Sequence, residues 1–209
     1  MAIFTPITPI KTELTQMIDE ENCLKSIAHG SEQALEKVYN HYCDKVYNTI
    51  LSYTKNSEDA DELLQDVFVT VYKTAKSFKF NSSISTWIYR IAVNKSLDFL
   101  RKKNSQKRKG FFTSLYVKDS AEVKYESTDF VHPGVKLENK EEAKLLFRTI
   151  DKLSENQKTA FILTQIEGLP QMEVADIMKQ SRKSVESLVQ RAKANLKKEL
   201  EKFYPERGK

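Results

Sequence analysis

A chain of 209 residues, 40% hydrophobic and 30% charged, has the composition of a soluble globular protein and the length of one large domain or two small ones. Its five Gly and five Pro are few for a sheet or barrel protein, so the composition predicts an all-α fold. The absence of any apolar run of about 18 residues excludes a membrane-spanning helix, and the net charge of +5 favours a polyanionic partner.

The first segment, residues 1–19, contains one Lys and interspersed Thr and Pro but no small-residue cleavage site, so it is predicted to be a loose leader and not a signal peptide. Cys23 and Cys43 have no CxxC spacing and no His partner in a zinc pattern. They are interpreted as reduced thiols of a cytoplasmic protein. The sequence predicts no metal site and no cofactor.

A helical pattern extends from about residue 20 to residue 53 and is interrupted by Gly30 and Ser31, which predicts a short helix followed by a long one capped by Ser31. The break at residues 55–57 precedes a further helix, residues 58–76, with Ser57 as its predicted cap.

One side of the helix predicted at 58–76 is apolar and the other is acidic. The apolar stripe comprises Ala60, Leu64, Val67, Val71 and Ala75, and the other side carries Asp61, Glu62, Gln65, Asp66 and Val69, with Phe68 at its edge. A solvated helix face is one interpretation of these charges. The exposed apolar side chains beside carboxylates favour the other, a protein partner with basic groups.

The next segment is a polar loop at residues 79–83, followed by a helix that the sequence predicts to begin at Ser85 or Thr86. One side of this helix carries Trp87, Arg90, Ile91, Asn94, Asp98 and Arg101. An indole, a guanidinium and an amide in line can stack on a base and bond its edges or the DNA backbone, although a single Trp on a helix can equally be a core residue. The basic run at residues 101–109 has two interpretations: it binds DNA phosphates, or it is a solubilising helix end.

From residue 110 to residue 135 no periodicity survives, which predicts a flexible linker between a domain at residues 20–109 and a second domain at residues 136–209. The second domain is predicted to contain helices at about 137–152, 155–166, 171–178 and 183–203, with a capping box opening the second of these at Ser154 and a tight turn ending at Ser181.

The last two helices have the outline of a helix-turn-helix. The final helix turns Val185, Leu188, Val189, Ala192, Leu196 and Leu200 inward and presents Lys183, Glu186, Ser187, Gln190, Arg191, Lys193 and Ala194 outward. A major groove admits such a helix, and the residues of its first turns reach base edges. The alternative is an ordinary helical hairpin.

Four segments in this order give the chain a strong resemblance to the extracytoplasmic-function (ECF) class of bacterial sigma factors. They are DADELLQDVFVTVYKTAKSF (59–78), STWIYRIAVNKSLDFLRKK (85–103), LSENQKTAFILTQIEGLPQMEVADIM (153–178) and SVESLVQRAKANLKKEL (184–200). The resemblance covers residues 24–200 except the linker. It implies a promoter-specificity subunit of RNA polymerase with no active site of its own, built from a region 2 and a region 4.

The resemblance also implies site residues and partners. The core-polymerase surface would comprise Asp61, Glu62, Gln65, Asp66 and Phe68, facing the clamp helices of the beta-prime subunit, with the beta subunit as a second contact. The −10 element would meet the loop Phe80, Asn81, Ser82 and Ser83, which captures a flipped base, and the stripe Trp87, Arg90, Asn94, Lys95 and Arg101. The −35 element would meet Arg182, Lys183, Ser184, Glu186, Ser187, Gln190, Arg191 and Lys193. An anti-sigma factor is an expected partner, and the linker would thread toward the RNA exit path.

The sequence departs from the family pattern at three places. Lys179 stands where the turn commonly has Gly, which predicts a left-handed Lys at a cost of about 1 kcal/mol. Glu186 and Leu188 replace basic residues, and Glu186 can accept a bond from a cytosine amino group. Phe80 and Asn81 replace a Gly-Asp pair, so promoter bases cannot be transferred from relatives.

Two other classes of function remain open. A helix-turn-helix regulator would bind duplex DNA without polymerase, but it gives the acidic face and the Trp87 stripe no role. A protein-interaction module would leave both basic surfaces solvated and its behaviour toward DNA insensitive to salt. An enzyme fits least, because the three histidines form no pattern with a nucleophile or metal and no glycine-rich phosphate loop is present.

Overall fold

The computed structural model describes residues 19–116 and 140–203, and every regular element in these ranges is helical. The all-α prediction is therefore confirmed. The first group of elements is α1 (Glu20–Ala28), α2 (Glu32–Thr54), α3 (Ser57–Thr74), the short η1 (Ala75–Ser77) and α4 (Ile84–Tyr116). The second group is α5 (Lys140–Ile150), α6 (Glu155–Phe161), the π-helical turn η2 (Ile162–Ile166), α7 (Gln171–Met178) and α8 (Arg182–Leu200).

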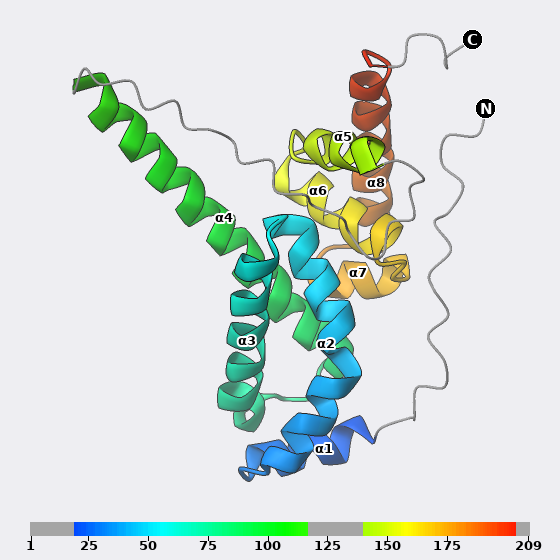
Figure 1. Cartoon of the computed structure of the whole chain (residues 1–209). Helices are drawn as coiled ribbons and strands as arrows, with labels where there is room; N and C mark the ends of the chain where they lie inside the picture. Colours follow the sequence, from blue (N-terminus) through cyan, green and yellow to red (C-terminus); the bar gives the residue numbers. More distant parts are fainter. Residues whose placement is uncertain (1–18, 117–139, 204–209) are drawn as a thin grey trace.

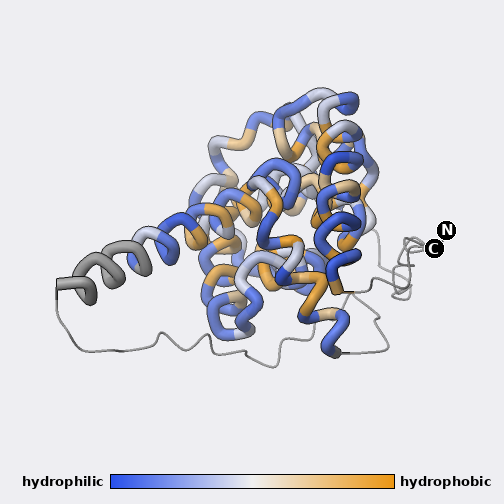
Figure 2. Tube along the Cα trace, turned by 90° about the horizontal axis from the view of Figure 1, so that it is seen from above, coloured by the Kyte–Doolittle hydropathy of each residue, from blue (hydrophilic) through white to orange (hydrophobic). Residues whose placement is uncertain are grey.

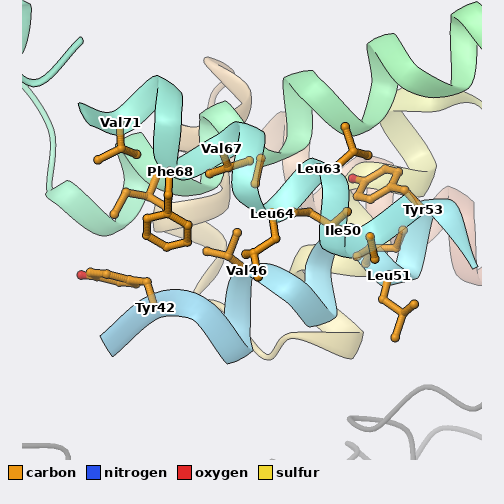
Figure 3. Packing of buried hydrophobic residues seen from close by; sticks show 14 of the residues in the cluster. Tyr42, Val46, Ile50, Leu51, Tyr53, Leu63, Leu64, Val67, Phe68 and Val71 are labelled. Carbon is orange, nitrogen blue, oxygen red and sulfur yellow. The ribbon is translucent and has the colours of Figure 1, made fainter. Parts of the chain in front are cut away.

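In the first group, α2, α3 and α4 pack against one another, and α1 lies across the end of α2 (Figure 1). Figure 3 shows Val46 and Ile50 of α2 directed toward Leu64 and Val67 of α3. The predicted apolar stripe of α3 is buried throughout, from Ala60 to Ala75. The apolar residues gather between the helices and the hydrophilic ones lie outside (Figure 2), as burial of amphipathic faces requires.

Helix starts agree with the sequence at one place and differ at two. Ser31 caps α2, its hydroxyl accepting from Ala34 N. The cap of α3 is Asn56, not Ser57, because the longer amide side chain reaches Asp59 N at 2.7 Å. The predicted start of α4 at Ser85 or Thr86 is also wrong. Ser83 Oγ accepts from Thr86 N at 3.0 Å, and the helix begins at Ile84.

The helix α4 is longer than the sequence predicts. It passes through Gly110, the predicted start of the linker, and ends at Tyr116. A single Gly inside a helix costs only about 1 kcal/mol relative to Ala, which the continuing backbone hydrogen bonds can offset. Figure 1 shows this end of α4 extending away from the other helices. The rest of the predicted linker and the predicted leader, except Asp19, lie outside the described residues.

In the second group, α7 and α8 form the predicted helix-turn-helix. The turn between them contains Lys179 at φ 54°, so the predicted left-handed Lys is confirmed. Its N–H closes the end of α7 on Ala175 O and Asp176 O. Ser181 caps α8 through Ser184 N. Ser154 stands at the predicted N-cap of α6, but its side chain makes no capping bond.

The two groups are packed against each other rather than separate. Phe147 and Phe161 of the second group belong to the same buried apolar cluster as Ile50 of α2. Tyr89 and Val93 of α4 lie in the apolar cluster of α7 and α8. This continuity gives α4 three helical partners, α2 and α3 in the first group and α7 in the second (Figure 1).

Polar side chains cross the same contact. The buried Tyr53 hydroxyl donates to Thr159 Oγ1 at 3.1 Å. Lys55 donates to Phe147 O and pairs with Asp151, which also pairs with Lys158 at 2.6 Å. Burial lowers the pKa of Lys55 to about 7, with the charge of Lys158 adding to the effect. Burial likewise lowers the pKa of Lys158 to about 8.

One buried carboxyl group in this contact, that of Glu167, is not fully hydrogen-bonded. Glu167 Oε1 is enclosed without a hydrogen-bond partner among the described residues. Burial raises the pKa of Glu167 to about 8, against a lowering hydrogen bond from Thr49 of α2. An uncharged Glu167 near neutral pH follows from this environment.

Candidate functional site

The acidic face of α3 is exposed as predicted. Asp61, Glu62, Gln65 and Asp66 all lie on the surface, and Val69 is 48% exposed beside them. Asp66 lies 3.5 Å from Lys95 Nζ of α4, an exposed pair of small energetic weight. The face therefore presents largely unneutralised carboxylates next to an apolar side chain.

The prediction that Phe68 is exposed beside these acids is wrong. Phe68 is 5% exposed and its ring packs edge-on against Tyr39, with centroids 4.7 Å apart. Its side chain falls on the boundary between the two faces of α3, and packing against α2 pulls it inward (Figure 3). The large apolar side chains that remain exposed near the acids are Tyr39, Val69 and Tyr72. The sequence patterns indicate neither Tyr39 nor Tyr72 as part of this surface, although helical spacing from Val69 could have indicated Tyr72.

The loop before α4 holds a strained aromatic residue. Phe80 adopts φ 54°, which is rare for a bulky residue. Its ring packs against Phe78 at 5.0 Å, and Phe78 packs against Trp87 at 4.6 Å. Phe80 stays 44% exposed. Strained residues of this kind concentrate at binding sites.

The polar residues of the loop differ in availability. Asn81 is exposed and Ser82 is half-buried. The Ser83 hydroxyl is committed to the helix start, because it accepts from Thr86 N and donates to Thr86 Oγ1 at 2.8 Å. Ser83 therefore positions the loop, and its hydroxyl is not free to bind a base.

The predicted stripe on α4 is divided among several partners. Trp87 is half-buried, and its ring packs against Phe78. It is therefore neither a fully buried core residue nor a freely exposed stacking surface. Arg90 Nη2 donates to Asp176 O of α7 at 2.6 Å. Arg101 binds Asp98 on its own helix and Glu155 of α6 at 2.9 Å. Asn94 is exposed.

The outer face of α8 is open. Lys183, Glu186, Ser187, Gln190 and Arg191 are exposed, as are Arg182 and Ala194, whereas Ser184 and Lys193 are half-buried. Local bonds order this face: Ser184 Oγ donates to Gln180, and Arg191 donates to Ser187 O at 3.2 Å. The predicted inward residues are buried except Leu200, which is half-buried at the helix end.

The described residues contain no group of three or more His, Cys, Asp or Glu side chains able to hold a metal ion. Within the same ranges, no helix combines the length and apolar character that a membrane crossing needs.

Comparison with known proteins agrees with this arrangement. The family described as Sigma-70 region 2 matches residues 38–106, and the family described as Sigma-70, region 4 matches residues 143–196. The ECF RNA polymerase sigma-E factor of Haemophilus influenzae is 25% identical over 190 residues, covering 90% of this chain and 98% of the relative. The ECF sigma factor SigW of Bacillus subtilis is 26% identical over 180 residues, covering 85% and 94%.

Two solved structures share the fold. CnrH in complex with the cytosolic domain of CnrY has a TM-score of 0.60 at 20% identity, covering 87% of this chain and 97% of that one. The sigma factor RpoE of Bartonella quintana in complex with the anti-sigma factor NepR has a TM-score of 0.59 at 19% identity, covering 79% and 96%. Since both family regions match in order, this chain belongs to the ECF sigma factors, the subunits that bind RNA polymerase and direct it to promoters.

Proposed function

We propose that each of three surfaces of this sigma factor has its own role. The acidic face of α3, with Asp61, Glu62, Gln65 and Asp66, binds the clamp helices of the beta-prime subunit, and the beta subunit adds a second contact. Carboxylates beside the exposed Val69 supply charge complementarity and apolar contact together. Phe68 contributes from beneath, by packing behind this face.

Each domain makes one of the two DNA contacts: the domain at residues 20–109 binds the −10 element, and the domain at residues 136–209 binds the −35 element. The loop from Phe80 to Ser83 captures a base flipped from the −10 element, and Trp87, Arg90, Asn94, Lys95 and Arg101 meet its upstream edge. The exposed face of α8 reads the −35 element, with Arg182, Lys183, Ser184, Arg191 and Lys193 on phosphates and Glu186, Ser187 and Gln190 toward bases.

The observation that carries this assignment is the orientation of α8. Val185, Val189 and Ala192 are buried against the domain, and the polar residues of the first turns lie on the surface of a capped helix. A recognition helix needs this arrangement in order to enter a major groove. An ordinary helical hairpin gives no reason for a basic and amide-bearing face on its outer side.

The same proposal assigns the protein no reaction of its own and places it in the cytoplasm with RNA polymerase. A protein inhibitor is its expected regulator. CnrH and RpoE, which share its fold, were each solved with a partner protein, CnrY and the anti-sigma factor NepR respectively.

The test is assembly with core polymerase followed by transcription from linear promoter DNA. Asp66→Arg places like charge against the basic partner and should weaken core binding at least about 30-fold, or about 2 kcal/mol. Glu36→Arg, which changes an exposed acid on α2 instead of α3, is the matched control and should bind normally.

Equal core affinity for both variants, with helicity intact, would remove the α3 assignment. If the chain alone shifted a promoter duplex as tightly as the holoenzyme does, the regulator alternative would replace the sigma assignment for α8.

A further inference from the structure

The basic run at residues 101–109 lies on α4, and the proposed function uses only its first residue, Arg101. The run also contains Lys102, Lys103 and, after three polar residues, Lys107-Arg108-Lys109. No acidic residue occurs between Asp98 and Asp119. The sequence allows two interpretations of this run, phosphate binding or a solubilising helix end.

The position of the run within α4 separates these interpretations. The helix ends at Tyr116, and its last turn contains no basic residue. Cations complement a helix dipole only within the last turn, whereas Lys109 lies about two turns before the end. The dipole therefore does not account for the run, and phosphate binding remains.

Packing against the other helices stops where the run begins. Among the residues whose side chains the structure describes, Leu100 is the last of α4 that packs against the apolar core. Beyond it, Lys102, Asn104 and Gln106 are exposed. Figure 1 shows the rest of the helix extending away from the other elements, so a surface of α4 is available there to a partner.

Two ion pairs hold the base of this projecting segment. Arg101 binds Glu155 of α6 at 2.9 Å, and Lys103 binds Asp59 of α3 at 2.9 Å. Lys102 lies between these two residues in the chain and is exposed. The pairs thus connect the base of the segment to both domains and leave Lys102 on the surface.

We propose that the projecting part of α4, residues 102–116, is an arm that binds the phosphates of the spacer duplex between the −35 and −10 elements. This inference rests on the proposed contact of α4 with the upstream edge of the −10 element. A helix rises 1.5 Å per residue, so Lys102 and Lys109 lie about 12 Å and about 22 Å beyond Asn94. At 3.4 Å per base pair, an arm that follows the DNA axis reaches about 4 to 7 base pairs into the spacer.

Charge complementarity identifies duplex phosphate as the occupant. Duplex DNA carries one negative charge per about 1.7 Å of its axis, and a run of cations without acids repels itself until a polyanion neutralises it. A helical segment without packing is also marginally stable alone, so bound phosphates would stabilise the arm. The contact reads no bases and is independent of the spacer sequence.

The experiment measures binding of holoenzyme to forked templates that carry the −10 element and lack a −35 element. In one template the upstream duplex is about 3 base pairs long, and in the other it is about 12. The test variant combines Lys107→Gln, Arg108→Gln and Lys109→Gln, because Gln removes the charge and keeps the helix propensity. On the long template its affinity should fall about tenfold and its salt slope by about 2. On the short template its affinity should not change.

A matched control removes the same charge elsewhere. Lys37→Gln, Lys45→Gln and Lys73→Gln combined change three exposed lysines of α2 and α3 and should leave binding to both templates unchanged. Lys102→Gln removes one cation from the base of the arm and should weaken binding to the long template about threefold.

The length of the duplex separates this inference from the proposed function. An equal loss on both templates would place the run against the −10 strands, the polymerase or RNA, and would overturn the spacer contact. Unchanged affinity of the triple arm variant for the long template would overturn it too. Asn94→Ala tests the −10 assignment separately: if it weakens binding to neither template, the proposed role of α4 at the −10 edge fails.

Discussion

The two helices assigned to promoter DNA, α4 and α8, differ in how far their basic residues are already engaged. Arg90 and Arg101 of α4 bond to the second domain. Lys183 and Arg191 of α8 are exposed, and the bonds that order Arg191 come from Ser187 on its own helix. The structure thus leaves the face proposed to read the −35 element exposed, and engages part of the side of α4 proposed to meet the −10 element in bonds to the second domain.

This difference indicates an order of events. Duplex contact through α8 needs no rearrangement of the free chain, whereas contact along α4 needs the bonds to α7 and α6 to break. Ion pairs and bonds at an exposed contact contribute little individually, so the buried part, with Tyr53, Tyr89 and Val93, carries most of the closure.

The largest expected effect comes from changing the loop before α4 while leaving α4 and α8 unchanged. Replacing Phe80-Asn81-Ser82 by Gly-Ala-Gly removes the stacking ring but keeps Ser83, which caps α4. Unstacking a base costs a few kcal/mol, so strand opening on closed linear DNA should fall on the order of 100-fold, equivalent to about 3 kcal/mol. Permanganate footprinting of single-stranded thymines measures this.

A pre-melted template supplies the control for that variant. Because the bubble removes most of the unstacking cost, transcription from it should recover substantially, and contact of α8 with the −35 duplex should stay intact. Normal opening of closed DNA by the variant would mean that the base is captured elsewhere, with Trp87 the first residue to examine.

Substitutions on the exposed face of α8 test the −35 contact alone. Glu186→Ala or Gln190→Ala should alter which −35 bases are preferred, by about 1–3 kcal/mol at the contacted position. Lys183→Ala or Arg191→Ala should weaken binding on all sequences and lower the salt slope by about 1. Binding of holoenzyme to a randomised −35 library at several salt concentrations distinguishes the two. If all four variants behaved alike, the orientation assigned to α8 would be wrong.

The sequence predicts most of α8 and less of α4, for a physical reason. The α8 face depends on helical period alone, so the spacing of apolar residues is enough to place Val185 and Leu196 inside and Gln190 outside. The surroundings of Arg90 depend on α7, more than eighty residues later in the chain, and no local pattern encodes that contact. The predicted exposure of Phe68 failed for a related reason, since its burial depends on packing against α2, including the ring of Tyr39.

The left-handed Lys179 shows where local pattern and family pattern together succeed. Comparison with the family's usual Gly predicts the conformation of Lys179, whereas the left-handed conformation of Phe80 was not predicted.

A smaller effect should follow from tightening the closed contact through Glu167. Its folded pKa, raised by burial to about 8, lies above the ordinary value of 4.5. The closed, folded state therefore binds more protons than the unfolded state between these values, and stability falls as pH rises through this window. Glu167→Gln removes the titration and should stabilise the chain by about 2 kcal/mol at pH 7.

The pH dependence of that gain is the sharper measurement. The difference in unfolding free energy between Glu167→Gln and the unsubstituted chain should grow from pH 4.5 to pH 8 and level off above it. Lys55 and Lys158 have lowered pKa values and act in the opposite direction, but they are present in both chains and cancel in the difference. A gain that does not vary with pH would show that Glu167 is already charged.

The smallest effect belongs to the turn between α7 and α8, which should change stability while leaving both DNA contacts as they are. Lys179 holds φ 54° at the end of α7, where a side chain is disfavoured by roughly 1 kcal/mol and Gly is not. Lys179→Gly should therefore raise the unfolding free energy by about 1 kcal/mol relative to Lys179→Ala, which keeps the strain and removes the charge that favours a helix C-terminus. Urea unfolding of the two variants gives the difference directly, and −35 affinity should be equal in both. A Gly variant no more stable than the Ala variant would mean that the turn relaxes to another backbone conformation, and the placement of α8 relative to α7 would then have to be reconsidered.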